Sequence, residues 1–100
     1  MDQSEIIWTT NASIDLRSIL DFYYKRNKSA VYSKWLLNEI EKRINLISIF
    51  PKIGRITDRK QVRLLSFHHY GIIYKVTDKE IYIQSIWDFR RNPNGRIDRL

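Results

Sequence analysis

The 100-residue chain has no cysteine, only three glycines and two prolines, and no apolar run approaching the roughly 20 residues of a membrane span. Without cysteine it has no disulfide scaffold, cysteine nucleophile or thiolate zinc site. Three scattered glycines do not make a phosphate-binding glycine loop. The polar, acidic start does not resemble a secretory signal. We therefore expect a cytoplasmic protein with no membrane partner.

The chain contains enough apolar side chains for one folded core. Hydrophobic residues make up 43% and aromatic residues 13% of the sequence, which argues against a wholly disordered chain. A chain of this length allows one small domain. We find no internal repeat or linker, so the predicted domain is the whole chain, 1–100.

Positive charge is concentrated in the second half of the chain. The formal net charge is +7, with seven basic and six acidic residues in 1–50 but eleven basic and five acidic residues in 51–100. A small domain with one basic region indicates a polyanionic partner, most commonly nucleic acid. The plainer alternative is a basic surface that only keeps the protein in solution.

Two helices are predicted in the first half. The short apolar segment 5–9 predicts a strand, and Asn11 or Ser13 is the expected helix cap after it. Apolar residues at helical spacing then predict a helix over about 13–26. A second pattern continues from Leu36 to Phe50 and ends at Pro51. Because the break between them is short, the two helices should form an antiparallel hairpin.

Three strands are predicted in the second half, at 62–67, 71–77 and 80–87. The resulting order, β-α-α-β-β-β, indicates an α+β fold in which the helical hairpin packs on one face of an antiparallel sheet. Alternation along the last strand predicts that Ile83 and Trp87 lie beneath the helices. The other face should be open, and Arg63 is expected to project from it.

The residue types narrow the chemistry that the chain supports. His68 and His69 are adjacent, so they would point to opposite sides of a strand, and we expect no metal site and no cofactor. Arginines at the loop, strand and tail positions should converge on one side, near Lys52, and guanidinium groups bind phosphate by paired hydrogen bonds. These arginines are Arg55, Arg63, Arg90, Arg91 and Arg96.

Such a cluster could hold an RNA backbone while a nearby side chain moves a proton, and His68, His69 and Tyr70 are the candidates for that step. The alternatives are a solvated surface or a clamp for an acidic protein.

Four ordered motifs carry a resemblance to a known family. They are Phe50-Pro51-x-x-Gly54-Arg55, Val62-Arg63-x-Leu65, Tyr70-Gly71-Ile72-Ile73-Tyr74-Lys75-Val76 and Ile81-x-Ile83-x-x-Ile86-Trp87-Asp88-x-Arg90-Arg91-Asn92-Pro93. Together with the strand and helical hairpin before them, they resemble the RelE/ParE superfamily, the toxins of type II toxin–antitoxin systems.

The resemblance implies a growth-inhibiting toxin in the cytoplasm that is neutralised by a cognate antitoxin in a hetero-oligomer, with Tyr32 and Trp35 as antitoxin contacts. ParE-type members act on DNA gyrase and are not enzymes. RelE-type members are metal-independent endoribonucleases that cut mRNA on the ribosome, and in that case Arg63, Arg90 and Arg91 would be catalytic. The expected nucleic-acid or target contacts are Lys52, Arg55, Arg59, Arg63 and Arg96.

The end of the chain favours the ParE side of the superfamily. RelE-type sites often place a tyrosine or histidine near the C-terminus, whereas this chain has neither after Pro93. The run Arg90-Arg91-Asn92-Pro93 looks more like ParE. We therefore predict a ParE-like toxin, with a RelE-like ribonuclease and a non-toxic homologue that binds antitoxin or DNA as the alternatives.

Overall fold

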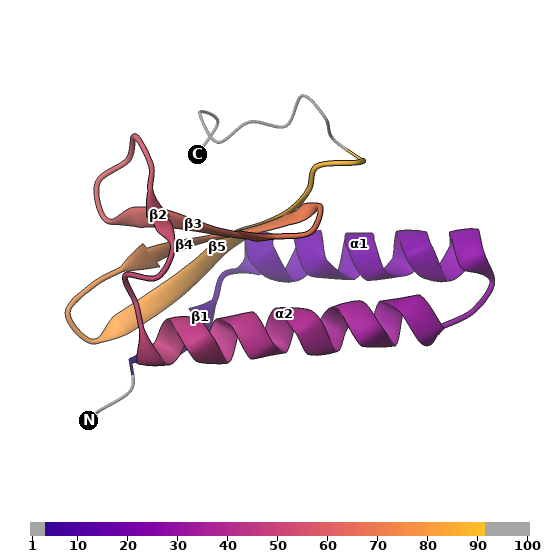
Figure 1. Cartoon of the computed structure of the whole chain (residues 1–100), viewed down its shortest axis with the longest axis horizontal. Helices are drawn as coiled ribbons and strands as arrows, with labels where there is room; N and C mark the ends of the chain where they lie inside the picture. Colours follow the sequence, from indigo (N-terminus) through magenta and orange to yellow (C-terminus); the bar gives the residue numbers. More distant parts are fainter. Residues whose placement is uncertain (1–3, 92–100) are drawn as a thin grey trace.

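In a computed structural model of the chain, residues 4–91 are described, and they form one curved sheet with two long helices (Figure 1). The elements in chain order are β1 (Glu5–Trp8), α1 (Thr10–Asn27), α2 (Val31–Ile49), β2 (Arg55–Ile56), β3 (Val62–Phe67), β4 (Tyr70–Val76) and β5 (Glu80–Asp88). The predicted element order and α+β class are confirmed. A two-residue strand that was not predicted, β2, is added to them between α2 and β3.

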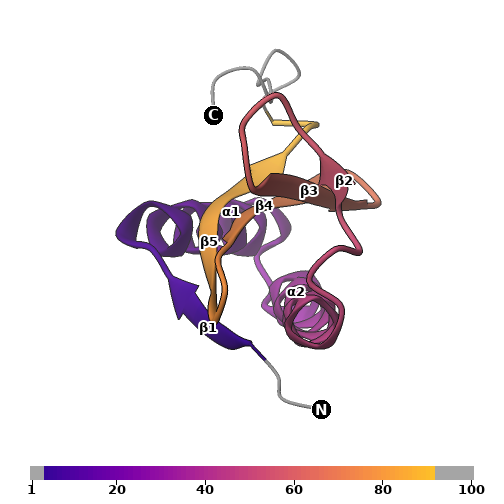
Figure 2. The same ribbon diagram turned by 90° about the vertical axis from the view of Figure 1, so that its left-hand side faces the viewer.

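The sheet is mixed rather than wholly antiparallel. Its strand order is β1-β5-β4-β3-β2, and every neighbouring pair is antiparallel except β1 and β5, which run parallel. Parallel neighbours need a long connection between them, and here both helices and three strands separate β1 from β5 in the chain. Figure 2 shows the sheet curving around α2, with β1 at one edge and β2 at the other.

Helix α1 is capped by Thr9 rather than by Asn11 or Ser13. The Thr9 Oγ1 accepts a hydrogen bond from the Ala12 N–H over 3.1 Å. The same hydroxyl donates to the Ile83 carbonyl of β5 over 2.7 Å. One side chain therefore begins the helix and fixes it to the sheet.

The main core lies between the helices and the sheet. Its fully buried members include Leu36 and Ile40 of α2, Ile72 of β4, and Ile81 and Ile83 of β5. The prediction for Ile83 is confirmed. Clustered burial of this kind supplies most of the stability of a small domain.

The prediction for Trp87 is wrong, because β5 is irregular. Tyr74 of β4 pairs with Ile83, but the preceding residue, Ile73, pairs with Ser85, so one residue of β5, Gln84, is left without a partner on β4. An extra residue reverses the side to which the following side chains point. Trp87 consequently packs on the face away from the helices.

Candidate functional site

The predicted cations fall into two separate groups instead of converging on one side. Lys52, Arg55, Arg59 and Arg63, called here the loop cations, lie between the end of α2 and the start of β3. Arg90 and Arg91 follow β5, which ends beside Tyr70 at the opposite end of β4. Figure 1 shows β2 near the end of α2, while the chain after β5 leaves the sheet nearer the turn between the helices. Arg96 lies outside the described residues.

Antiparallel pairing explains this separation. Arg63 is at the start of β3 and Phe67 is at its end, opposite Tyr70 and hence near Asp88. Four residues of strand span about 13 Å at roughly 3.3 Å per residue. The expectation that one phosphate site joins Arg63 to Arg90 is therefore wrong.

Arg63 also points to the side opposite to the one predicted. It lies directly across from Tyr74, a member of the main core, and alternates with Val62 and Leu64, which belong to the cluster on the other face. Its Nη1 donates to the carbonyl of Gly54 over 2.7 Å and to that of Lys52 over 3.2 Å. The half-buried guanidinium therefore fixes the segment after α2 to β3.

The face of the sheet away from the helices is apolar where an open basic surface was expected. Val62, Leu64 and Ile73 are buried there, with Trp87 packed against them. Trp87 also stacks on Phe89, with ring centroids 6.4 Å apart.

The other three loop cations, Lys52, Arg55 and Arg59, are exposed. They are interspersed with two isoleucines that are also exposed, Ile53 at 42% and Ile56 at 74%. Strand β2 is at the edge of the sheet. The loop cations therefore border a surface that combines positive charge, apolar side chains and a free strand edge, which is a combination suited to a protein partner.

A second polar cluster surrounds Arg90, and we call it the hairpin-tip cluster because it lies where α1 ends and α2 begins. Its members are Tyr23, Tyr32, Tyr70, Asp88 and Arg90. The Arg90 Nη2 donates to the hydroxyls of Tyr23, Tyr32 and Tyr70 over 3.1, 3.3 and 3.4 Å. The hydroxyls of Tyr32 and Tyr70 also share a hydrogen bond of 2.5 Å.

Asp88 is the buried hydrogen-bond acceptor of this cluster. Its side chain is 1% exposed, and its Oδ2 accepts the Tyr23 hydroxyl over 2.7 Å. Its Oδ1 accepts the backbone N–H of Arg90 over 3.0 Å and that of Arg91 over 3.4 Å. Buried polar groups need partners of this kind, and Asp88 thereby fixes the chain just after β5.

Two phenols of the hairpin-tip cluster, Tyr23 and Tyr70, are held in their protonated form. Burial, reinforced by the bond to Asp88, raises the pKa of Tyr23. Burial, reinforced by the bond to Tyr32, raises the pKa of Tyr70 much further above its usual value. Both groups therefore keep their protons at neutral pH, where a general base needs a pKa near the working pH.

The predicted antitoxin contacts, Tyr32 and Trp35, lie beside this cluster. Tyr32 is half-buried, and its ring is 5.4 Å from that of Trp35, which is 40% exposed. Trp35 in turn lies 5.6 Å from the ring of His68 in the turn between β3 and β4. A small hollow of about 240 Å³ opens next to them, lined by Tyr23, Arg26, Asn27, Tyr32 and Arg90.

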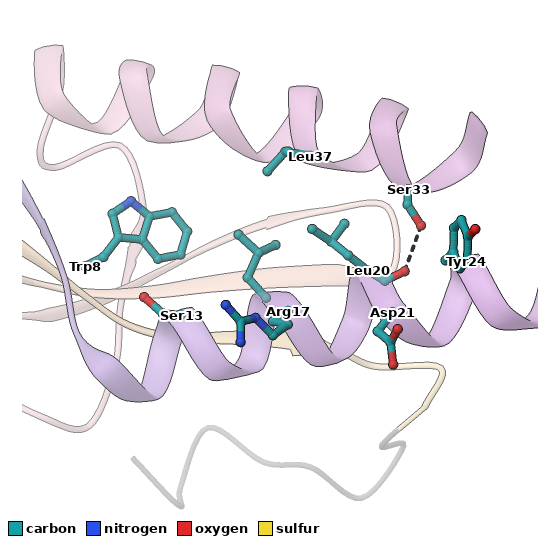
Figure 3. A pocket seen from close by; sticks show the side chains of 9 residues that line it. Trp8, Ser13, Arg17, Leu20, Asp21, Tyr24, Ser33 and Leu37 are labelled. Carbon is teal, nitrogen blue, oxygen red and sulfur yellow. Dashed lines mark hydrogen bonds between the residues drawn. The ribbon is translucent and has the colours of Figure 1, made fainter. Parts of the chain in front are cut away.

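A larger apolar groove, called here the Trp8 groove, runs between the two helices (Figure 3). It has a volume of about 570 Å³. Its apolar lining comes from Trp8 of β1, Leu16 and Leu20 of α1, and Leu37 of α2. Helical spacing alone does not reveal this groove, which forms because the three half-buried leucines each leave one side accessible.

Two further expectations concern metals and membranes. Within residues 4–91 no three histidine or acidic side chains gather in a way that would hold a metal ion. Over the same residues, neither helix has the length and apolar character to cross a membrane. His68 and His69 are both exposed in the turn between β3 and β4.

Solved structures of other proteins resemble the fold of this chain. The chain matches two solved structures over 84% of its length. One is a chromosomal ParDE toxin–antitoxin system from P. aeruginosa, with a TM-score of 0.71, 23% identity and 94% of that chain covered. The other is the toxin–antitoxin complex RelBE2 from Mycobacterium tuberculosis, with a TM-score of 0.62, 17% identity and 95% covered. At these identities the two likenesses show the fold.

The family assignment comes from the sequence. A search of curated proteins finds no match. A sequence model described as the ParE toxin of the type II toxin–antitoxin system parDE matches residues 6–93, which is nearly the whole chain. This protein therefore belongs to the ParE toxin family of type II toxin–antitoxin systems.

Proposed function

We propose that this chain is a cytoplasmic toxin that acts on DNA gyrase, and that its antitoxin neutralises it by laying a segment in the Trp8 groove. The observation that carries the proposal is the match to the ParE toxin family over residues 6–93. ParE-type members of the superfamily act on gyrase, and the two solved structures compared above come from toxin–antitoxin systems.

The arrangement of the side chains supports a target that is a protein. The exposed loop cations stand beside exposed Ile53 and Ile56, and mixed apolar and charged surfaces are typical of protein interfaces. Arg63 bonds to backbone carbonyls. Burial raises the pKa values of Tyr23 and Tyr70, two of the phenols beside Arg90. Neither feature is what a ribonuclease site requires.

The Trp8 groove has the chemistry that an amphipathic helix or extended apolar segment needs. It lies between the two antiparallel helices, and its apolar lining comes from Trp8, Leu16, Leu20 and Leu37. Docking of such a segment is driven by burial of apolar side chains at regular spacing. Tyr32 and Trp35 remain predicted antitoxin contacts, and they flank Ser33, which lines the same groove.

The test is carried out on purified toxin separated from its antitoxin. We expect inhibition of plasmid supercoiling by gyrase, and no codon-positioned cuts in the messages of a translation mixture. Reversal of charge in Arg55→Glu should weaken gyrase inhibition several-fold, since rim charges chiefly affect association. Lys79→Glu, in the exposed turn between β4 and β5, is the matched control.

Two results would contradict the proposal. Message cuts without any effect on gyrase would assign the chain to the RelE-like ribonuclease alternative. Inhibition of neither process, with the antitoxin still bound tightly, would identify the non-toxic alternative.

A further inference from the structure

The small hollow at the hairpin tip presents several hydrogen-bond donors to one space. Arg26 and Asn27 from the last turn of α1, Tyr32 from the first turn of α2, and Arg90 from the segment after β5 all line it. With Tyr23 of α1 counted as well, three separate parts of the chain supply two guanidinium groups, one amide and two phenols.

Arg90 is held in place before any ligand arrives. Three tyrosine hydroxyls accept hydrogen bonds from its Nη2, and Asp88 accepts its backbone N–H. The guanidinium also lies over the Tyr23 ring, with its carbon 5.5 Å from the ring centroid. A cation fixed in this way loses little conformational entropy when it binds an anion.

The free donors and the charge of the hollow both favour an anion. Among residues 4–91, the side chains of Arg26 and Asn27 have no hydrogen-bond or ion-pair partner. The one carboxylate of the cluster, Asp88, is buried and already accepts Tyr23 and two backbone N–H groups. The negative end of the α1 dipole and the positive end of the α2 dipole meet at the hairpin and offset each other. The two guanidinium groups, of Arg26 and Arg90, therefore make the hollow positively charged.

An aromatic surface continues directly from the hollow. The Tyr32 ring, which lines it, packs against Trp35, whose side chain is 40% exposed. Indole rings stack well on nucleobases, and paired guanidinium donors match the geometry of phosphate oxygens.

We propose that the hairpin-tip hollow binds the phosphate group of a nucleotide between Arg26 and Arg90, with the base of the nucleotide stacked on Trp35. Asn27 donates to a phosphate oxygen, and the three tyrosines position Arg90. This site is distinct from the loop cations and does not rest on the gyrase proposal.

The test compares three probes by NMR titration of the whole toxin: adenosine 5′-monophosphate, inorganic phosphate and adenosine. We expect the mononucleotide to shift the side-chain signals of Arg26, Arg90 and Trp35 together. Inorganic phosphate should shift the arginine signals alone and bind more weakly. Adenosine without its phosphate should bind least, since it lacks the charge-assisted hydrogen bonds.

Variants separate this site from adventitious attraction to a basic protein. Arg26→Gln removes one donor group without touching the tyrosine network and should weaken nucleotide binding about tenfold, as expected for a hydrogen bond to a charged group. Lys79→Gln removes the same charge elsewhere and should change the affinity less than about twofold. Trp35→Ala should weaken binding of the mononucleotide but not of inorganic phosphate.

Equal losses from Arg26→Gln and Lys79→Gln would overturn the site. Equal affinity for inorganic phosphate and the mononucleotide would overturn the nucleotide assignment.

Discussion

At the residue scale, the Tyr74 hydroxyl decides the path of the chain after α2. Its oxygen donates to the Pro51 carbonyl over 2.8 Å and accepts the Gly54 N–H over 2.8 Å. Tyr74 itself is completely buried. The sequence showed that Pro51 ends the helix. It gave no sign that a tyrosine 23 residues later would fix the loop, because that contact depends on the sheet register.

Gly54 is required here because Tyr74 lies so close to it. A Cβ atom at Gly54 would lie 2.6 Å from the Tyr74 hydroxyl oxygen. We expect Gly54→Ala to lower the free energy of unfolding by about 1–3 kcal/mol, as overpacking does in a rigid core, measured by urea denaturation.

The double variant Gly54→Ala with Tyr74→Phe tests the cause. Removing the hydroxyl relieves part of the clash, so the combined loss should be smaller than the sum of the single losses. Additive losses would show that the contact with this oxygen is not the reason for the glycine.

The buried phenols of the hairpin-tip cluster make stability depend on alkaline pH. A tyrosine of the unfolded chain ionises near its ordinary pKa of 10.0, whereas the raised pKa of Tyr70 keeps the folded chain protonated to higher pH. The free energy of unfolding should therefore be undiminished below about pH 10 and decrease above it, because the unfolded chain releases the proton first.

Urea denaturation between about pH 9 and 11 measures this slope. Tyr70→Phe should make it shallower, and the exposed Tyr24→Phe should not. An unchanged slope in Tyr70→Phe would contradict the assignment to Tyr70.

At the element scale, Thr9 joins the start of α1 to β5. Its hydroxyl accepts the Ala12 N–H and donates to the Ile83 carbonyl. We expect Thr9→Ala to lower the free energy of unfolding by about 1–2 kcal/mol, since a helix cap and a hydrogen bond are lost together. Thr10→Ala, one residue later and exposed, is the control. If the two variants lost equal stability, the cap would not be the cause.

The elements themselves could be predicted from spacing, but their exact pairing could not. Periodicity placed both helices, and Pro51 ended the second of them where expected. The extra residue in β5 left no mark in the sequence, because Gln84 fits an ordinary exposed strand position. That single residue moved Trp87 from the helix side to the opposite face. The direction of β1 also depends on a partner more than seventy residues away.

At the scale of the whole molecule, the sequence indicated a basic protein of the right family but not where its charges meet. The excess of arginine is real, yet antiparallel pairing separates Arg63 from Arg90. The hairpin-tip cluster combines Tyr23 and Tyr32 of the helical hairpin with Tyr70 of β4 and Arg90 after β5. Only the three-dimensional arrangement reveals it, since the sequence predicts Tyr32 only as an antitoxin contact and Tyr70 only as a candidate for proton transfer.

The two helices together create the Trp8 groove, and a variant of one lining residue tests its role. Leu37 of α2 is half-buried and projects into the groove (Figure 3). We expect Leu37→Ala to weaken binding of the antitoxin about tenfold or more, as truncation of an apolar anchor in an interface does. Titration calorimetry of the toxin with its antitoxin measures the affinity.

Leu46→Ala provides the matched control for Leu37→Ala. Leu46 is on the same helix, does not line the Trp8 groove and is 37% exposed. This substitution should change antitoxin affinity by less than about twofold, because an exposed leucine outside the interface contributes little to binding. Gyrase inhibition by both variants should stay unchanged, since the loop cations lie at another surface. A larger loss in Leu46→Ala than in Leu37→Ala would place the antitoxin on the opposite side of α2.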